Sequence, residues 1–492
     1  MQKKIARENA AKGIAGDGPV HDAVAFASGI AQKKSTDWEV FASYNKVGTV
    51  RFARNRLLES KTFGDFGIGI RIIVNGSTGF SSTSGFGKTE IEKAADAAQS
   101  AANAKAPDGD YHGLPQPLGQ TRLEKPFDPL IRDLGAEEMT QIGASSLEIA
   151  KSIGGKLDVS GSTTFVYEKA VIKNSAGVDC TDESSFAYGS VTAEDRRGPH
   201  ENSGIGWSIA RFLSDFRPEK AGREAVENAS VKLKDAKISA GEYDVVFGNY
   251  AVTDLAEHIL SYAISLPSLD AGITYFWGKL GKKVAAEDFS LVDDGTLEGS
   301  LAAKQNDDEG TPTQRTPIIE GGTLTNLISD DYYAKKMSRK LKKYFESTGN
   351  AFRFEAVPGR RYDSLPSACP TNLIVAPGRM DDGEILSGIR KGIFVGRTWY
   401  TYPVNQTVGD FTCTNRSNTF LIENGEITAA LPANSFRIND NLPRLLQRIE
   451  GIGKETKAVT VWGGSSAVYA PQVRMSKVRV VYSKEAAMGG GG

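Results

Sequence analysis

Three side chains that could move protons lie close together on one predicted helix. The segment from Ala251 to Ile264 follows an apolar strand, and it carries Asp254, Glu257 and His258 outside its apolar stripe. Asp254 and His258 stand four residues apart, a spacing at which a carboxylate and an imidazole can pair on one helix face. Such a pair could serve a hydrolase. It is more often a surface or interface contact, and we favour that interpretation.

Other motifs for catalysis or metal binding are incomplete. No Gly-x-Ser-x-Gly sequence accompanies this helix, so a serine triad has little support. Gly85 to Thr89 resembles the end of a phosphate-binding loop, but Ser82 stands where the first glycine is required, and a helix entry loop explains it better. The remaining histidines are interpreted as surface residues, two of the cysteines (Cys369 and Cys413) as small buried residues, and Cys180 as a residue with no nearby base. These are His21, His112, His200, Cys180, Cys369 and Cys413.

A buried strand and an apolar core must position the helix. Tyr243 to Gly248 has the composition of such a strand. The residues that follow at helical spacing are apolar and predict one stripe facing a core. They are Val252, Leu255, Ala256, Ile259, Leu260, Ala263 and Ile264.

The first half of the chain predicts an α/β layer. Alternating strands run from Trp38 to Val74, and Asn75-Gly76 is a strong hairpin signal. Further strands are expected over 156–193. Helices are expected over 89–105, with Thr89 as N-cap, over 136–153 and over 219–234. Strands flanked by long helices predict an antiparallel sheet with helices on one face, over residues 38–235, after an N-terminal extension at 1–37.

The second half is dominated by short strands and turns. A linker at 235–241 leads into a β-rich, barrel-like domain over 242–484, with a late helix expected from Asn441 to Ile452. Residues 485–492 end in four glycines and are expected to be disordered. The predicted fold class is therefore α+β.

Composition excludes several classes of partner. The chain has 59 basic and 60 acidic residues, so no global field favours nucleic acid or an anionic membrane. No stretch approaches 18 uninterrupted apolar residues, and no apolar segment of a signal peptide follows Met1. Three widely spaced cysteines suit a reducing compartment. A soluble cytoplasmic protein is expected.

A further set of motifs is spread along residues 38–483 in a fixed order. They are Phe66–Arg71, Gly76–Phe80, Asn174–Gly177, Asp308–Pro312, Thr348–Asn350, Pro370–Leu373 with Pro377-Gly378, Gly409–Phe411 and Ile422–Ile427. No single motif is diagnostic. Together they resemble the TldD/PmbA family, also called modulator of DNA gyrase.

The resemblance implies a heterodimeric metallopeptidase with two kinds of subunit. The TldD branch carries His-Glu-x-x-x-His on the helix after a Val-Val strand, and a C-terminal Cys completes a zinc site in which the Glu acts as base. Two His five apart diverge by roughly 140° on an ideal helix, so that branch is expected to distort the turn. The corresponding positions here are Glu257, His258, Tyr262 and Trp462, which replace every ligand and the base. The sequence around His258 resembles the PmbA (TldE) branch, which lacks the motif.

The chain is therefore expected to be a non-catalytic TldE-type subunit with no metal or cofactor of its own. The resemblance implies zinc in a TldD-type partner, a heterodimer or possibly a homodimer, and unfolded or short peptides held by main-chain pairing. Two alternatives stay open. One is a self-sufficient hydrolase with an altered site at Asp254, Glu257 and His258, and the other is a non-enzymatic homodimeric binding protein. The N-terminal extension and the charged loop 194–203 could form an interface or lid, although solvated loops are the simpler interpretation.

Overall fold

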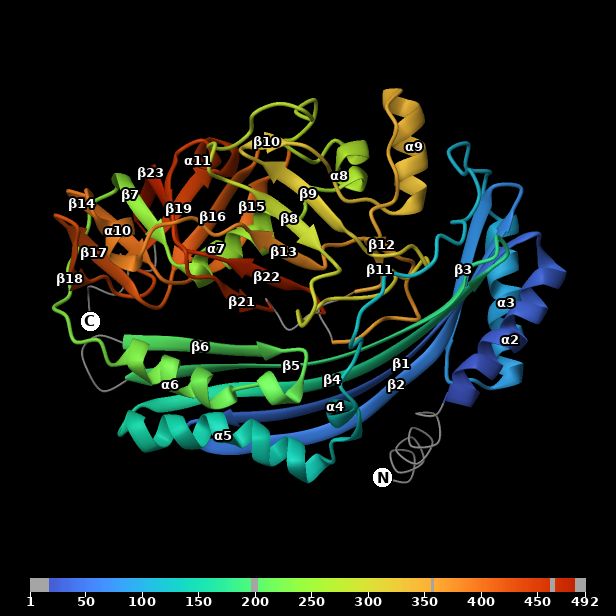
Figure 1. The fold of residues 1–492 in the computed structure, drawn as a ribbon, viewed down its shortest axis with the longest axis horizontal. Helices are drawn as coiled ribbons and strands as arrows, with labels where there is room; N and C mark the ends of the chain where they lie inside the picture. The colour runs from blue at the N-terminus through green and yellow to red at the C-terminus, as the bar shows by residue number, and fades with distance from the viewer. Residues whose placement is uncertain (1–16, 196–201, 355–357, 461–464, 483–492) are drawn as a thin grey trace.

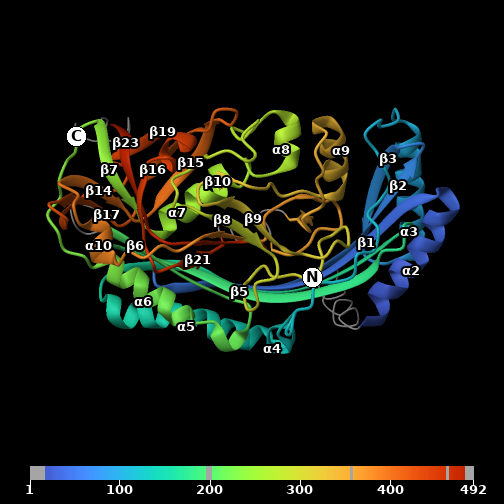
Figure 2. The same cartoon turned by 45° about the horizontal axis from the view of Figure 1, so that its top comes forward.

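The computed structural model describes residues 17–195, 202–354, 358–460 and 465–482 (Figure 1). A long curved sheet from the first half of the chain runs beneath a second half built from several shorter sheets. Both views show the second half lying over the concave side of the long sheet (Figure 1, Figure 2). Within the described ranges, no helix has the length and apolar character needed to cross a bilayer.

The long sheet has six antiparallel strands in the order β3-β2-β1-β4-β5-β6. Its strands are β1 (Asp37–Ala53), β2 (Arg56–Val74), β3 (Ser77–Ser84), β4 (Asp158–Asn174), β5 (Asp179–Asp195) and β6 (Asn202–Ala210). Asn75 and Gly76 join β2 to β3 with φ of 52° and 79°, the paired positive values of the hairpin turn that an Asn-Gly sequence favours. The antiparallel sheet and this hairpin are as predicted.

Helices cover the convex face of the long sheet (Figure 1). They are α2 (Asp17–Lys34), α3 (Lys88–Asn103), α4 (Pro129–Asp133), α5 (Ala136–Gly154) and α6 (Pro218–Ala229). Gly79 lets α3 approach β3, because a Cβ there would lie 2.0 Å from the carbonyl oxygen of Ala98. Thr89 is not the N-cap, since the helix begins at Lys88 after Gly87. Part of the predicted extension is a packed helix, because Val20, Val24 and Ala27 of α2 are buried against the sheet.

The second half contains two larger sheets and one small one. The nine-stranded sheet has the order β15-β16-β19-β23-β7-β14-β17-β18, with β20 pairing β23, and the six-stranded sheet has the order β10-β9-β8-β13-β22-β21. The first comprises β7 (Gly241–Phe247), β14 (Lys391–Val395), β15 (Thr398–Asn405), β16 (Asp410–Asn415), β17 (Thr419–Glu423), β18 (Glu426–Ala430), β19 (Phe436–Asn441), β20 (Ile449–Ile452) and β23 (Val473–Tyr482). The second comprises β8 (Leu291–Asp294), β9 (Arg315–Glu320), β10 (Thr323–Leu324), β13 (Asn372–Val375), β21 (Lys457–Val459) and β22 (Ala467–Ala470), and the small sheet pairs β11 (Ala351–Phe352) with β12 (Ser367–Ala368).

The predicted α+β class is confirmed, with one refinement. Among the described residues the sheets of the second half are open, and none closes into a barrel. The division into domains at 38–235 and 242–484 stays a prediction, and the tail at 485–492 lies outside the described residues. The helices of this half are α7 (Asn249–Leu255), α8 (Leu266–Ala271), α9 (Asp331–Leu341), α10 (Asp382–Leu386) and α11 (Leu442–Leu446).

The late helix predicted over Asn441–Ile452 is only partly correct. Leu442–Leu446 is helical, but Ile449–Ile452 forms strand β20, which pairs antiparallel with β23. Residues 449–452 pair through their main chain with β23, more than twenty residues further along the chain. This pairing outweighs the local helix propensity of the segment.

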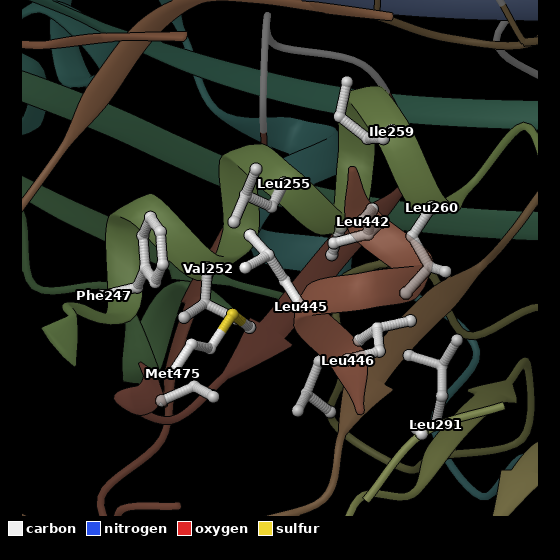
Figure 3. Packing of buried hydrophobic residues seen from close by; sticks show 14 of the residues in the cluster. Phe247, Val252, Leu255, Ile259, Leu260, Leu291, Leu442, Leu445, Leu446 and Met475 are labelled. Atoms are coloured by element: carbon white, nitrogen blue, oxygen red, sulfur yellow. The ribbon is translucent and has the colours of Figure 1, made fainter. Parts of the chain in front are cut away.

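The largest core lies between α7, α11 and the two larger sheets. Every residue of the predicted apolar stripe is buried in it. Figure 3 shows Val252, Leu255 and Leu260 on the side of the segment that faces the leucines of α11 and Leu291. This packing fixes the helix that carries the candidate site.

The two halves are also joined by buried charges, here called the ionic cluster: Glu168, Asp182, Lys304, Asp308 and Arg360. The Arg360 guanidinium lies 2.9 Å from Asp182, 3.2 Å from Asp308 and 3.9 Å from Glu168. Lys304 pairs with Glu168. Glu168 and Asp182 belong to the long sheet, whereas the other three residues come from the second half. The charges therefore hold the halves together where water is excluded.

Candidate functional site

The helix after β7 widens into a π turn at Ala256–Leu260. The Ser261 N–H donates to the carbonyl of Ala256 at 2.8 Å, a bond across five residues where an α-helix makes one across four. The Ser261 hydroxyl donates to the Glu257 carbonyl. Tyr275 donates to the Ile259 carbonyl at 3.4 Å. The regular α-helix predicted over 251–264 is therefore wrong at its centre, where the main-chain bond spans five residues instead of four.

The π turn changes which residues share a face. A bond from i to i+5 brings residues five apart nearer to one side of the segment than an α-helix would. Glu257 and Tyr262, the positions predicted to correspond to the two His of the TldD motif, have this spacing. Glu257 is half-buried, whereas Tyr262 follows the π turn and is 54% exposed.

Asp254 fastens α7 to the start of β15. Its carboxylate accepts a hydrogen bond of 2.9 Å from the Thr398 hydroxyl. Burial raises the pKa of Asp254 to about 6, and the nearby Arg397 partly opposes that rise. The role that the structure supports for Asp254 is to hold two elements in register.

Glu257 and His258 occupy half-buried positions on the π turn. Burial, reinforced by the charge of Asp254, raises the pKa of Glu257 to about 7. Burial lowers the pKa of His258, whereas a facing carboxylate would raise it.

Glu257→Gln is expected to stabilise the protein at alkaline pH. The folded state binds the Glu257 proton more tightly than the unfolded state, so ionisation costs stability progressively from about pH 4.5 to about pH 7. Glutamine carries no such cost, and the gain should be about 1–3 kcal/mol at pH 8 and close to zero at pH 4.5. Urea unfolding of the wild-type chain and the variant at the two pH values measures this difference in the free energy of unfolding. The exposed Glu320→Gln is the control, and a less stable Glu257→Gln at pH 8 would contradict the assignment.

Tyr262 lies beside the β15–β16 hairpin. It is 54% exposed and borders a shallow hollow with Tyr275, Pro403 and Gln406. Trp462 lies outside the described residues. Within the part of the chain that the structure describes, no three His, Cys, Asp or Glu side chains gather as a metal site.

The other candidate residues are dispersed, with one exception. His21 lies 3.5 Å from Thr181, His112 contacts Arg339, and His200 is outside the described ranges. Cys180 and Cys413 are free thiols whose pKa is raised mainly by burial. The exception is Cys369, whose proximity to Glu257 the sequence did not indicate. Burial and the nearby charge of Glu257 raise its pKa to about 11, which keeps the thiol protonated beside the π turn.

Sequence reasoning also missed the edge strand β15. It ends the nine-stranded sheet, and its outward residues Tyr400, Tyr402 and Val404 are more than half exposed. A bulge between Trp399 and Tyr402, with φ of 48° at Tyr400, reshapes this edge. The alternation of Tyr400, Tyr402 and Val404 was a usable signal, but sequence alone did not reveal that this strand lies at an edge.

The ends of the charged loop 194–203 contact the second half near β15. Glu194 pairs with Arg416 at 3.5 Å, and Ser203 lies 3.0 Å from Ser417. Arg416 stacks over the ring of Trp399 at 4.2 Å. Residues 196–201 lie outside the described ranges. The loop is thus anchored at both ends beside β15.

Comparison with known proteins connects this geometry to a family. Models of the PmbA/TldA metallopeptidase match domain 1 at residues 38–102, the central domain at 129–233 and the C-terminal domain at 240–482. The chain is 27% identical to the metalloprotease TldD homolog of Buchnera aphidicola over 417 residues, 81% of each chain. It is 26% identical to the metalloprotease PmbA of Escherichia coli O157:H7 over 303 residues, 60% of each chain. The crystal structure of TldE from Thermococcus kodakarensis has the same fold, with a TM-score of 0.81 and 22% identity over 94% of this chain and 100% of that one.

Proposed function

Because this chain belongs to the PmbA/TldA metallopeptidase family, we propose that it is the non-catalytic TldE-type subunit of a cytoplasmic TldD–TldE zinc peptidase. The observation that carries the proposal is the pair of side chains at the positions that we align with the two zinc-binding His, which are Glu257 on the π turn and Tyr262 just after it. In this proposal the chain keeps the fold of the family but not the zinc ligands. Zinc, its bound water and the general base are assigned to the TldD-type subunit.

The side chains of this segment do not fit a zinc site. Glu257 and His258 could each donate a lone pair to zinc, but among the described residues no third His, Cys, Asp or Glu gathers with them. Tyr262 is exposed to solvent, and an indole such as that of Trp462 is not a zinc ligand. We therefore assign this chain no step of the hydrolysis itself.

The proposed contribution of this chain is to bind the peptide. The edge of β15 can extend its sheet by one strand when an unfolded or short peptide pairs with it through main-chain groups. Such pairing tolerates many sequences, since backbone atoms carry most of the recognition. The Asp254–Thr398 hydrogen bond fixes the first residue of this edge against α7, which leads into the π turn.

Metal content and assembly test the proposal. The chain should be purified alone and after co-expression with a TldD-type subunit that carries His-Glu-x-x-x-His. We expect well under about 0.1 zinc per chain alone, and a one-to-one complex with about one zinc per pair. A TldD-type variant with both His changed to Ala is the control, and it should still assemble but without zinc. Near-stoichiometric zinc in this chain alone would support a self-sufficient hydrolase, and failure to assemble would support a homodimeric binding protein.

A further inference from the structure

Two arginines lie opposite each other where the edge strand β15 begins. Thr398 of β15 pairs with Asn415 of β16, and the Arg416 N–H donates to the Arg397 carbonyl at 3.0 Å, so the two arginines continue this pairing by one residue. Side chains directly opposite in an antiparallel pair lie on the same face, and like charges there destabilise the pair. The two cations therefore cost stability unless anions lie beside both of them.

Arg416 has partners within the chain. Its guanidinium lies 3.5 Å from the Glu194 carboxylate and stacks over the Trp399 ring at 4.2 Å. These contacts hold the Arg416 side chain in place and neutralise part of its charge. They leave the charge of Arg397 on the same face without compensation from Glu194.

The Arg397 side chain lacks such partners. It is half-buried, and within the described ranges its guanidinium makes no ion pair and donates no hydrogen bond. Burial lowers the pKa of Arg397, and the nearby Asp254 opposes this change, but the Asp254 carboxylate accepts its hydrogen bond from Thr398. Withdrawing a guanidinium from water without giving it an acceptor is costly. An anion that arrives from outside the chain would remove this cost.

The place of Arg397 gives a direction to a peptide on β15. The strand runs from Thr398 to Asn405, and Arg397 immediately precedes it. A strand that adds antiparallel to β15 begins beside Asn405 and ends beside Thr398, so its C-terminus reaches Arg397. A carboxylate and a guanidinium can form two parallel hydrogen bonds there. A strand that adds in the parallel direction would instead bring its positively charged N-terminus to the two arginines.

We propose that Arg397, with Arg416 opposite it, binds the C-terminal carboxylate of a short peptide that pairs antiparallel with β15. This inference rests on the proposed peptide-binding role of the chain and adds to it a direction and a preference for a free carboxyl terminus. Main-chain pairing alone would not distinguish a C-terminal acid from a C-terminal amide, because both forms offer the same backbone groups along the strand.

Binding of one peptide in two forms tests the proposal. A peptide long enough to span β15, with a fluorophore at its N-terminus, is prepared as the free acid and as the C-terminal amide. Each form is titrated with the full-length chain at low salt, and fluorescence anisotropy measures the affinity. The free acid is expected to bind at least about tenfold more tightly, because a hydrogen bond between charged groups contributes more than a neutral one. Arg397→Gln should remove this difference by weakening the binding of the free acid alone.

Two controls define the ligand and the site. An amidated peptide that ends in Glu carries its carboxylate on a side chain and should bind no better than the plain amide. If it binds as tightly as the free acid, the assignment to the peptide terminus is wrong. Arg315→Gln removes an arginine of β9 whose side chain is 58% exposed, and it should leave both affinities unchanged.

Stability distinguishes a binding role from a structural one. Arg397→Gln removes one of two like charges, so the variant should unfold at the urea concentration of the wild type or at a higher one. A variant that unfolds at a clearly lower concentration and still prefers the free acid would show that Arg397 is structural. Equal binding of acid and amide by the wild-type chain would overturn the carboxylate site and leave peptide binding intact. Binding of neither form would overturn the proposed peptide-binding role as well.

Discussion

Replacing Arg360 by methionine is expected to lower the free energy of unfolding by about 3–5 kcal/mol, the loss typical of breaking a buried ion pair from one side. The guanidinium is 1% exposed and lies within 4 Å of Asp182, Asp308 and Glu168. Methionine fills a similar volume but leaves these carboxylates with Lys304 as the remaining cation of the cluster. Burial already raises the pKa of Asp308, and loss of Arg360 removes a charge that opposes the rise.

Urea unfolding of the purified chain measures this effect, with Arg361→Met as the matched control. Arg361 is the next residue and pairs with Asp363 at 2.6 Å and Asp65 at 3.2 Å, but it is partly exposed, so its loss should cost less than about 1 kcal/mol. The Arg360 variant should recover part of its stability as pH falls to 5, because carboxylates of raised pKa then take up protons in the folded state. Equal losses in the two variants would show that the cluster does not depend on its central cation.

The second large effect is expected in peptide cleavage and depends on the proposed function. Mixing this chain with a TldD-type subunit should raise cleavage of an unfolded peptide at least about 100-fold over either chain alone, since the metal and the peptide-binding edge are then present together. A chelator should return the rate to background. Hydrolysis of a fluorescent peptide measures the cleavage rate. Each chain assayed alone is the control.

Variants in the π turn locate the chemistry within the assembled pair. Glu257→Gln and His258→Ala should leave kcat within about threefold of the wild-type pair, because neither side chain is assigned a role in catalysis. A fall of more than about 100-fold in the His258 variant would instead place a hydrolytic centre in this chain. The two outcomes separate the proposed subunit from the alternative of a self-sufficient hydrolase.

Features with strong local signals were predictable from the sequence. Asn75-Gly76 specifies its turn through two residues that accept positive φ, and the stripe from Val252 to Ile264 is buried as its spacing predicts. The π turn was not predictable by the same reasoning. Apolar spacing reports which residues face a core, but it does not report whether Ser261 N–H bonds to the carbonyl four or five residues before it.

Contacts between segments far apart in the chain could not be predicted from the sequence alone. Glu39 and Arg353 pair at 2.8 Å although 314 residues separate them. Cys369 lies close enough to Glu257 for the carboxylate to affect its pKa, and no local pattern around either residue indicates this. Strand β20 and the exposed edge of β15 depend on which strands pair, which tertiary structure decides.

The ionic cluster also imposes an order on biosynthesis. Glu168 leaves the ribosome 136 residues ahead of Lys304, an interval of about 7–27 s at 5–20 residues per second. During that interval the Glu168 carboxylate has no cation from the second half beside it and depends on water and the Ser184 hydroxyl, and Arg360 emerges later still. The second half of the chain can therefore cover the concave face of the long sheet only after most of the polypeptide has been translated.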